Sequence, residues 1–512
     1  MHRRNMFVKL MALVLATITA MMLFAACGEP ADPNDTTQTT PADGAITTTT
    51  PGDSEATTTA PAASDVETTT PTPVVDLPVV DEKFNSEVVI LYWNDVQHAE
   101  FDVEELTGDI ISDAIHNRNI AVENALGVTL NWVGTPGNYS NQKKFVQTAF
   151  NGINSGGEHD IFAGYSMTGA TLAVNGHVQN LKSLDYLDFE QPYWPASLIN
   201  QATINDKLFF ASGDISTNML HMMYTIFFNK QILTDHGLED PYALVENGTW
   251  TYTKMFEMSA NLYNDENGDG TRDQGDSYGF CMADNHNYDA FFTAAGLNSV
   301  EKDAADQLII SPSYNSEKTV ALLEGICTFI WGGQDGYRGA DDNMFSKGNT
   351  LFTIDRARMP MVYKNEMSFE YGIIPMPKFD EAQKNYVTCL SFPYTMYSIS
   401  IAAKHTEAAA ATLECMAAES YNQVTPVLFE VSMKLKYSSD NQASKMYDII
   451  REGVHIDVGR IFTTELENFS YSTFRNACSK NAVSSWASAY KGTEKMMTTL
   501  LKKINDAISK LD

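Results

Sequence analysis

The chain is poor in basic side chains. It has 34 Lys and Arg against 65 Asp and Glu in 512 residues, a formal charge of −31. Phosphate backbones and anionic lipid surfaces need clustered Lys and Arg, so this composition argues against a nucleic-acid binder and against a protein held on lipid by a basic face. Aromatic residues are not scarce, at 11%, which excludes a wholly disordered chain.

Familiar catalytic and metal motifs are missing as well. The sequence contains no HExxH, no GxSxG and no Gly-rich phosphate loop. Beyond Cys27 there are five cysteines without CxxC spacing, which predicts buried small hydrophobic residues rather than a zinc site or a disulfide framework. We therefore expect a protein that is not an enzyme.

The first 26 residues have the pattern of a secretory signal. Arg3, Arg4 and Lys9 precede an uninterrupted run of apolar or small residues over 10–26. A transmembrane anchor is the alternative, and 17 residues lie at the lower edge of what can span a bilayer. The end of the run, LFAACG, resembles a bacterial lipobox, although Phe24 stands where Leu is usual. This resemblance implies that Cys27 is lipidated, with residues 1–26 as a lipoprotein signal peptide, and holds the chain to the membrane.

Residues 27–83 have a composition unlike the rest. Between Thr36 and Thr72 there are 15 Thr in 37 positions, and residues 28–83 contain no aromatic side chain. Such a segment cannot bury enough apolar surface to offset the entropy of ordering, so we predict a disordered tether after the lipidated cysteine. A plain spacer is the expected role, and glycosylation of the Thr clusters stays open.

A folded α/β module is predicted from residue 84 onward. Strand-like apolar runs at 88–93, 128–133 and 160–164 alternate with helical spacing over 111–126 and 145–153. This order predicts a parallel sheet with helical crossovers. Ligands bind at the carboxyl ends of strands in such sheets, so the residues after the first and third strands are candidate ligand contacts: Trp93, Asn94, Asp95, Tyr165 and Ser166.

Five segments, taken in order, resemble bacterial extracellular solute-binding proteins of the sugar-binding type (family 1). They read NDKLFFASGD (205–214), YTIFFNK (224–230), NGTWTY (247–252), FSKGNTLF (345–352) and YGIIPMPK (371–378). In the third segment, Thr251 or Thr253 can cap a helix. Each segment is weak alone, and the ordered set spans most of residues 84–450.

The resemblance implies a periplasmic-binding-protein-like fold, with two interleaved α/β lobes, a hinge and a central cleft. The implied boundaries are 84–223 with 391–450 for the first lobe, and 224–390 with 451–512 for the second. The implied function is capture of a solute and its delivery to the permease of an ABC transporter. We expect a monomer on the extracellular face of the cytoplasmic membrane, with no nucleic-acid partner.

Sugar sites combine aromatic platforms with polar side chains that bind hydroxyl groups. Besides the strand-end residues, the candidates are Trp331, Asp355, Arg356, Arg358 and Trp486. Asp355 and the two arginines stand where maltose-type members have a small-residue turn, which argues against maltose itself. Two neighbouring arginines are suited to a carboxylate-bearing sugar or another anion. Core packing is the alternative for every aromatic named, and the expected one for Trp132, Trp194 and Trp250.

One further motif resembles a calcium loop, D-x-[DN]-x-[DN]-G. Its predicted ligands are Asp265, Asn267, Asp269, Thr271 (through its carbonyl), Asp273 and Asp276. The alternative is an Asx-rich turn that needs no ion. We expect structural calcium at this loop and no other cofactor.

Two other functions stay open. Plentiful carboxylates keep a secreted carbohydrate-active enzyme as one alternative. A ligand-sensing receptor that signals to a membrane kinase is the other, because the sequence does not separate a permease partner from a kinase partner.

Overall fold

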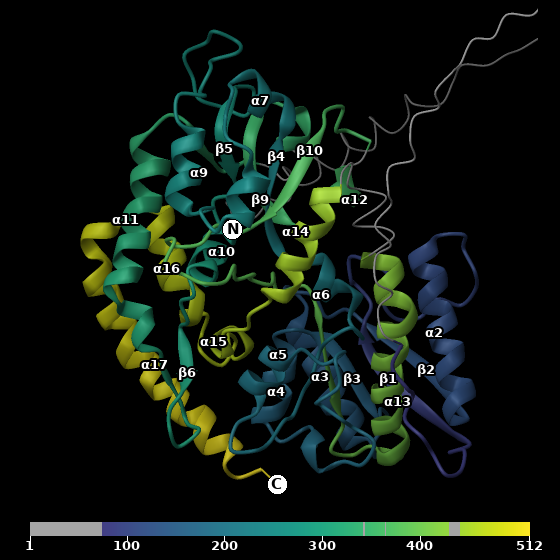
Figure 1. Ribbon diagram of the computed structural model, residues 1–512. Helices are drawn as coiled ribbons and strands as arrows, with labels where there is room; N and C mark the ends of the chain where they lie inside the picture. The colour runs from purple at the N-terminus through teal and green to yellow at the C-terminus, as the bar shows by residue number, and fades with distance from the viewer. Residues whose placement is uncertain (1–73, 341–343, 364, 430–440, 512) are drawn as a thin grey trace, which may run out of the picture. The chain divides into compact units, whose positions relative to one another are not determined.

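The computed structural model describes residues 74–340, 344–363, 365–429 and 441–511. They belong to one compact unit, which spans Thr70–Asp512. The predicted signal peptide, Cys27 and nearly all of the tether lie outside the described residues. The module is a mixed α/β protein with two main sheets, which confirms the fold class predicted from the sequence (Figure 1).

The first sheet has four strands in the order β11-β3-β1-β2. β1 pairs in parallel with β2 and β3, and β11 is antiparallel to β3. The strand–helix–strand alternation and the parallel pairing expected for residues 88–164 are therefore confirmed. The strands are β1 (Ser86–Trp93), β2 (Val128–Thr135), β3 (Ile161–Tyr165) and β11 (Thr395–Ile399).

Helices cover this first sheet. α2 packs against α13, which also contacts β1 and β11 (Figure 1). α2 begins at the N-cap Asp109, whose carboxylate accepts the Ser112 N–H at 3.0 Å, and it ends at Gly127 with φ 67°. The helices of this part are α2 (Ile110–Leu126), α3 (Gln142–Asn154), α4 (Thr168–Val174), η1 (Leu181–Ser183), α5 (Ala196–Ala202), α6 (Thr217–His221), α13 (Thr406–Glu419) and the π-helical turn η4 (Ser420–Val424).

The second sheet has five strands in the order β10-β4-β9-β5-β8. β4 is antiparallel to both β10 and β9, whereas β9, β5 and β8 run parallel. The carboxyl ends of β10, β9, β5 and β8 consequently lie at one edge, where β4 begins. The strands are β4 (Tyr224–Asn229), β5 (Tyr278–Met282), β8 (Gly336–Arg338), β9 (Thr350–Arg356) and β10 (Tyr371–Pro375).

The helices near the second sheet are mostly short. α9 begins at Thr251, whose hydroxyl oxygen accepts the Lys254 N–H at 3.2 Å, so Thr251 rather than Thr253 is the cap. α14 contacts β10 of this sheet. The helices are α7 (Lys230–Asp235), α8 (Pro241–Glu246), α9 (Tyr252–Ser259), α10 (Asn287–Ala294), η2 (Pro312–Asn315), α11 (Glu317–Gly332), η3 (Phe345–Lys347), α12 (Met359–Tyr363) and α14 (Asn441–Glu452).

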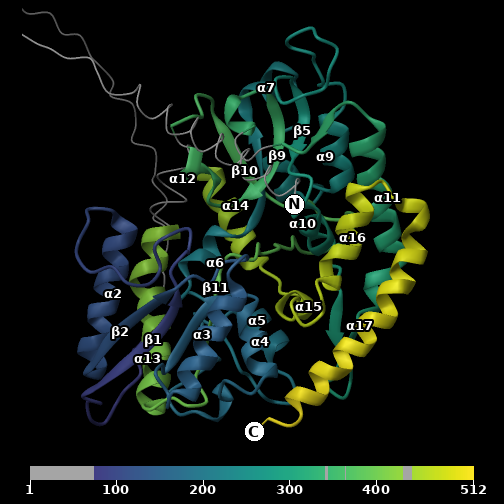
Figure 2. The ribbon, with the colours of Figure 1, turned by 180° about the vertical axis from the view of Figure 1, so that it is seen from behind.

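The C-terminal segment adds a further helical group. α16 packs against α10, α11 and α17, and α17 runs along the small hairpin of β6 and β7 (Figure 2). Its elements are α15 (Val458–Ile461), α16 (Phe469–Ser479), η6 (Val483–Ser485) and α17 (Trp486–Ile508), with β6 (Val300–Lys302) and β7 (Leu308–Ile310) in the hairpin. No helix among the described residues has the length and apolar character to cross a membrane.

Three chain segments cross side by side near the carboxyl edges of both sheets. Met223 bridges Leu390, and Thr388 bridges Val454. The Tyr224 N–H donates to the Cys389 carbonyl at 2.9 Å. We call residues 221–224, 388–391 and 453–455 the crossing segments.

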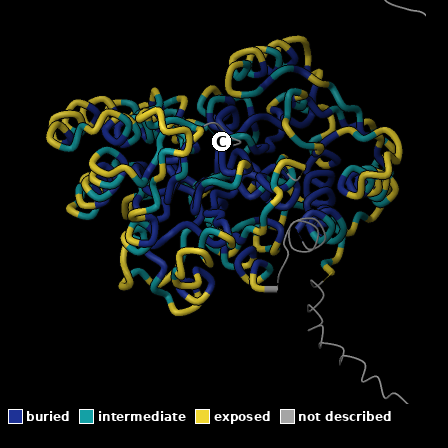
Figure 3. The backbone as a smooth tube through the Cα atoms, turned by 90° about the horizontal axis from the view of Figure 1, so that it is seen from above, coloured by how far each residue is buried: buried dark blue, intermediate teal, exposed yellow. Residues whose placement is uncertain are grey.

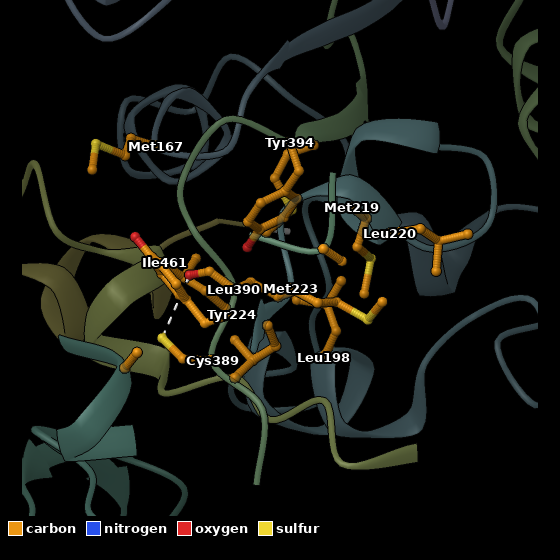
Figure 4. Close-up of a cluster of buried hydrophobic side chains, with 14 of the residues drawn as sticks. Met167, Leu198, Met219, Leu220, Met223, Tyr224, Cys389, Leu390, Tyr394 and Ile461 are labelled. Atoms are coloured by element: carbon orange, nitrogen blue, oxygen red, sulfur yellow. Dashed lines mark hydrogen bonds between the residues drawn. The ribbon is translucent and has the colours of Figure 1, made fainter. Parts of the chain in front are cut away.

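Apolar side chains fill the space around the crossing segments (Figure 4). Residues from α5, α6, α15, two crossing segments and their neighbours meet there, and three of those labelled are methionines. The labelled residues are Met167, Leu198, Met219, Leu220, Met223, Tyr224, Cys389, Leu390, Tyr394 and Ile461. Methionine is unbranched and adapts to changes in packing, which suits a region where the chain passes between sheets.

Buried backbone continues through the interior, while the exposed segments lie at the periphery (Figure 3). The five described cysteines form no disulfide with one another and are all buried, as the sequence predicted: Cys281, Cys327, Cys389, Cys415 and Cys478. They act as small apolar residues of the core.

Candidate functional site

The carboxyl edges of both sheets adjoin the crossing segments. Tyr165 at the end of β3 pairs with Thr395, which begins β11. Arg356 at the end of β9 pairs with Tyr224, which begins β4. A ligand that reaches this region can therefore contact strand ends of both sheets, which is the placement expected of a binding site in open α/β sheets.

The predicted ligand contacts after β1 and β3 have different surroundings. The Trp93 indole is only 1% exposed, and its Nε1–H donates to the Thr395 hydroxyl at 2.9 Å. Tyr165 is buried with its ring 5.3 Å from that of Trp93. Ser166 is buried and donates to the Phe392 carbonyl at 2.5 Å. In this arrangement these side chains pack the strand ends against the segment that leads into β11.

Asn94 is exposed and Asp95 is half-buried. The Asp95 carboxylate accepts three hydrogen bonds, from Gly137 N–H at 2.8 Å, Asn138 N–H at 2.9 Å and Asn141 Nδ2 at 3.0 Å. It therefore fixes the loop between β2 and α3. That loop carries Tyr139, which is 57% exposed beside the carboxyl edge of the first sheet.

Asp355 and Arg356 are the last two residues of β9, and Arg358 follows two residues later. The Arg356 Nε–H donates to the Asp355 carboxylate at 3.0 Å. Arg358 Nη1 lies 3.5 Å from Nε2 of His98, a residue that follows β1. Burial, followed by Arg358 and Arg356, lowers the pKa of His98 to about 4. The end of β9 thus contacts the loop that follows the first strand of the other sheet.

The two tryptophans from the second half of the sequence are not brought together. Trp331 is half-buried, donates from Nε1 to the Cys478 carbonyl at 2.9 Å, and has Arg338 3.7 Å above its ring. A hollow of about 290 Å³ lies beside it, at the outer strand β8. Trp486 is 2% exposed and donates to the Asn315 amide oxygen at 2.9 Å, so it packs in the core under α17.

The calcium-like loop forms a network of side-chain turns. Asp265 accepts the Gly268 and Gly270 N–H groups, each at 2.8 Å. Asn267 accepts the Asp269 N–H at 2.9 Å, and Asp269 accepts the Thr271 N–H at 2.6 Å.

The two other predicted ligands of this loop make similar bonds. Asp273 accepts the Gly275 N–H at 2.6 Å, and the buried Asp276 accepts the Glu266 and Asp273 N–H groups. Within the described ranges, no three His, Cys, Asp or Glu side chains converge to hold a metal ion. The arrangement fits the Asx-rich turn directly, and calcium stays a prediction.

A cluster that the sequence did not reveal lies beside the crossing segments. It consists of Asp289, Phe392, Arg460, Tyr471 and Arg475, and we call it the Asp289 cluster. Asp289 is 3% exposed and accepts from Arg460 Nη1 at 2.9 Å, and from Arg475 Nε at 3.0 Å and Nη2 at 2.5 Å. The cluster joins α10 to the end of α15 and to α16.

Aromatic faces complete the cluster. The Arg460 guanidinium lies 4.1 Å from the centre of the Phe392 ring, and Arg475 lies 4.0 Å from that of Tyr471. The two rings are 5.6 Å apart and both are half-buried. Aromatic faces next to fixed charged donors are the combination that binds sugar rings and their hydroxyl groups.

His286, which precedes α10, extends this site toward β9. Burial, followed by Arg356, lowers the pKa of His286 to about 4, so the imidazole is neutral near pH 7. A neutral imidazole offers one donor and one acceptor, as a sugar hydroxyl requires. His286 lines a hollow with Asp355, Arg356, Asn287 and Phe345 among others.

These hollows are small in the present arrangement. The one beside His286 has about 20 Å³, and two that adjoin Arg460 have about 10 Å³ each. Such volumes hold about one water molecule each. A molecule of the size of a sugar therefore does not fit into these hollows as they stand.

The rule that pointed to Trp93 and Tyr165 could have found part of this site. Residues 283–287 directly follow β5 at the carboxyl edge of the second sheet, as Asn94 and Asp95 directly follow β1 in the first. The apolar run at 278–282 predicts a strand, and the strand-end rule would then have pointed to the residues after it. Arg460 and Arg475 carry no such signal, because they reach Asp289 from 171 and 186 residues away in the chain.

Solved structures of sugar-binding proteins have the same fold. The cyclic α-maltosyl-1,6-maltose binding protein of Arthrobacter globiformis matches with a TM-score of 0.56 and 15% identity, over 81% of this chain and 99% of that one. A cyclo/maltodextrin-binding protein complexed with maltotetraose has a TM-score of 0.52 and 13% identity, over 83% and 98%. An extracellular solute-binding protein of Staphylococcus aureus in complex with maltose has a TM-score of 0.51 and 13% identity, over 84% and 99%.

By sequence, no family and no curated protein matches the chain. At these identities the structural likeness defines the fold. The described chain has the two-lobed α/β fold of extracellular sugar-binding solute-binding proteins, as expected from the five sequence segments.

Proposed function

We propose that this protein captures a sugar or an oligosaccharide at the Asp289 cluster and has no catalytic role. The observation that carries the proposal is the position of this cluster. Aromatic faces and buried charged donors stand where the carboxyl edges of both sheets meet the crossing segments. The fold supports the proposal, because the similar structures named above are of sugar-binding or solute-binding proteins.

Thermal-shift screening of the full chain against mono- and oligosaccharides tests this function. A ligand at about 100 times its dissociation constant adds about 2.7 kcal/mol to the free energy of unfolding. The Tyr471→Ala variant should weaken binding at least about tenfold, the loss expected for an aromatic platform. Tyr490→Ala is the matched control, because Tyr490 is also half-buried but packs against Trp486 on α17. Absence of binding to any glycan would contradict the proposal.

The proposed context is a lipid-anchored protein on the outer face of the cytoplasmic membrane. Cys27 would carry the lipid, residues 28–83 would separate the module from the bilayer, and the permease of an ABC transporter would receive the solute. Metabolic labelling with a radioactive fatty acid tests the anchor. Label should be incorporated by the natural chain and lost in Cys27→Ser, whereas Cys281→Ser should retain it.

A further inference from the structure

Two guanidinium groups share one buried carboxylate in the Asp289 cluster. The Asp289 Oδ2 atom accepts from both Arg460 and Arg475, at 2.9 and 2.5 Å. The arginine side chains are 12% and 17% exposed, and Asp289 is 3% exposed. One carboxylate balances one of the two positive charges, so the trio has a net charge of +1 in a region largely removed from water.

Within the described part of the chain, no second carboxylate lies within 4.0 Å of either guanidinium. Asp457, the other acid in the hollow beside Arg460, accepts from Ser299 N–H and Oγ at 2.7 Å each and from Gly459 N–H at 2.8 Å. Its oxygens are therefore bound by other donors.

The remaining neighbours are neutral. Arg460 donates from Nη2 to the Leu390 carbonyl at 2.9 Å, and Arg475 donates from Nη1 to the Asn285 amide oxygen at 2.9 Å. Phe392 and Tyr471 cover the guanidinium faces.

Charges of both signs act on the buried groups near the two arginines. Burial is the main cause that lowers the pKa of His286; Arg356 and Arg475 lower it further, whereas Asp289 and Asp355 raise it. Burial raises the pKa of Tyr165, Tyr224 and Tyr394, while Arg460 opposes this for Tyr165 and Tyr394, and Arg356 opposes it for Tyr224. In a chain with a formal charge of −31, three arginines therefore act on the buried groups of this site, alongside Asp289 and Asp355.

We propose that the solute is an anionic sugar, such as a uronate-containing oligosaccharide, whose carboxylate binds Arg460 and Arg475. This inference rests on the proposed function, because it names the class of sugar that the same site takes. Arginine is suited to the role, since a guanidinium has five N–H donors, of which Arg460 uses two and Arg475 uses three in the bonds above. The carboxylate would supply the negative charge that the trio lacks, while the aromatic faces contact the sugar ring.

Calorimetric titration of the full chain tests this with paired probes that differ only in having carboxylates in place of hydroxymethyl groups. Trigalacturonate is compared with galactotriose, and glucuronate with glucose, with sodium acetate as an anion that has no sugar ring. We expect each acidic sugar to bind at least about tenfold more tightly than its neutral partner, the ratio that about 1.4 kcal/mol provides. Acetate should bind more weakly than either acidic sugar. Added salt should lower the affinity for the acidic sugars more than the affinity for the neutral ones.

Variants of Arg475 test whether the arginines cause the preference for acidic over neutral sugars. Arg475→Gln should reduce the ratio of acidic-sugar affinity to neutral-sugar affinity, and Arg475→Lys, which keeps the charge but not the fork, should retain part of this ratio. Lys502→Gln is the control, because it removes one positive charge from the exposed face of α17. If Arg475→Gln lowers the melting temperature, the double variant Asp289→Asn/Arg475→Gln, which removes both charges of that ion pair, serves instead.

The outcomes separate the two proposals. Neutral sugars that bind as tightly as acidic ones would overturn the anionic-sugar inference and leave the proposed function intact. Acetate that binds as tightly as the uronates would overturn it in favour of a general anion site. A folded protein that binds no sugar of either kind would overturn both proposals.

Discussion

Arg475 donates two hydrogen bonds to Asp289, from Nε at 3.0 Å and from Nη2 at 2.5 Å. This bidentate pair fixes α16 against α10, and Arg460 adds a third hydrogen bond to the same carboxylate. Because all three side chains are largely buried, the pair links the stability of the module to the geometry of its candidate site.

Removing the charge of Asp289 should destabilise the protein strongly. In Asp289→Asn the two guanidinium groups would have no carboxylate within 4.0 Å among the described residues. Loss of one partner from a buried ion pair costs about 3–5 kcal/mol. Urea denaturation measures the change, and the exposed Asp506→Asn on α17 is the control, with no measurable loss expected. Equal stability of the two variants would contradict this prediction.

Trp93→Phe should reduce stability without changing the affinity for the solute. The change removes the indole N–H that donates to Thr395 and leaves a small cavity at the end of β1. A buried hydroxyl that loses its partner costs about 1–3 kcal/mol. Thermal and urea denaturation should show this loss, and Thr395→Val should give a similar one that does not add to it in the double variant. If affinity falls and stability does not, Trp93 is a ligand contact after all.

The sequence predicted the first half of the fold well because its signals are local. Buried parallel strands have continuous apolar runs, so β1, β2 and β3 could be placed to within a few residues. The strand-end rule then placed Tyr165 and Ser166 at the carboxyl end of β3, where the structure also has them. It did not separate an exposed side chain from a buried one, and Trp93, at the last position of β1, is buried against Thr395.

The Asp289 cluster could not be predicted in the same way. Its members come from α10, the segment before β11, and α15–α16, and no periodicity in the sequence relates them. Their proximity depends on how the C-terminal segment returns to the second sheet. The five family-like segments end at residue 378, before Phe392, Arg460 and Tyr471, so the resemblance gave no guidance there.

Calcium at loop 265–276 is a prediction from the sequence, and calorimetry of the full chain tests it. If the motif binds Ca²⁺, the ion should raise the melting temperature and a chelator should reverse the effect, because a bound ion offsets the repulsion among five acidic side chains. Asp269→Asn removes a ligand charge and should weaken binding. Glu266→Gln, at a position that supplies no ligand, should not. A melting temperature unaffected by Ca²⁺ and by chelator would leave the Asx-rich turn as the whole explanation.

The stability of the protein should fall between about pH 4.5 and about pH 7 because of Glu465. This residue lies between α15 and α16, where its Oε1 accepts from the Thr171 hydroxyl of α4 and its Oε2 has no hydrogen-bond partner. Burial raises the pKa of Glu465 from 4.5 to about 7. The folded state therefore holds the proton more tightly than the unfolded state, and the stabilisation is complete below pH 4.5 and lost as the pH rises through 7.

Glu465→Gln should remove this dependence, because glutamine keeps the shape and stays neutral. At about pH 8 the variant should be more stable than the natural protein by up to about 3 kcal/mol, while below pH 4.5 the two should be similar. Urea denaturation at several pH values measures the difference. Glu467→Gln is the matched control, because Glu467 is exposed two residues further along the same loop. A natural protein and a Glu465→Gln variant with parallel pH profiles would show that the buried carboxyl does not titrate in this range.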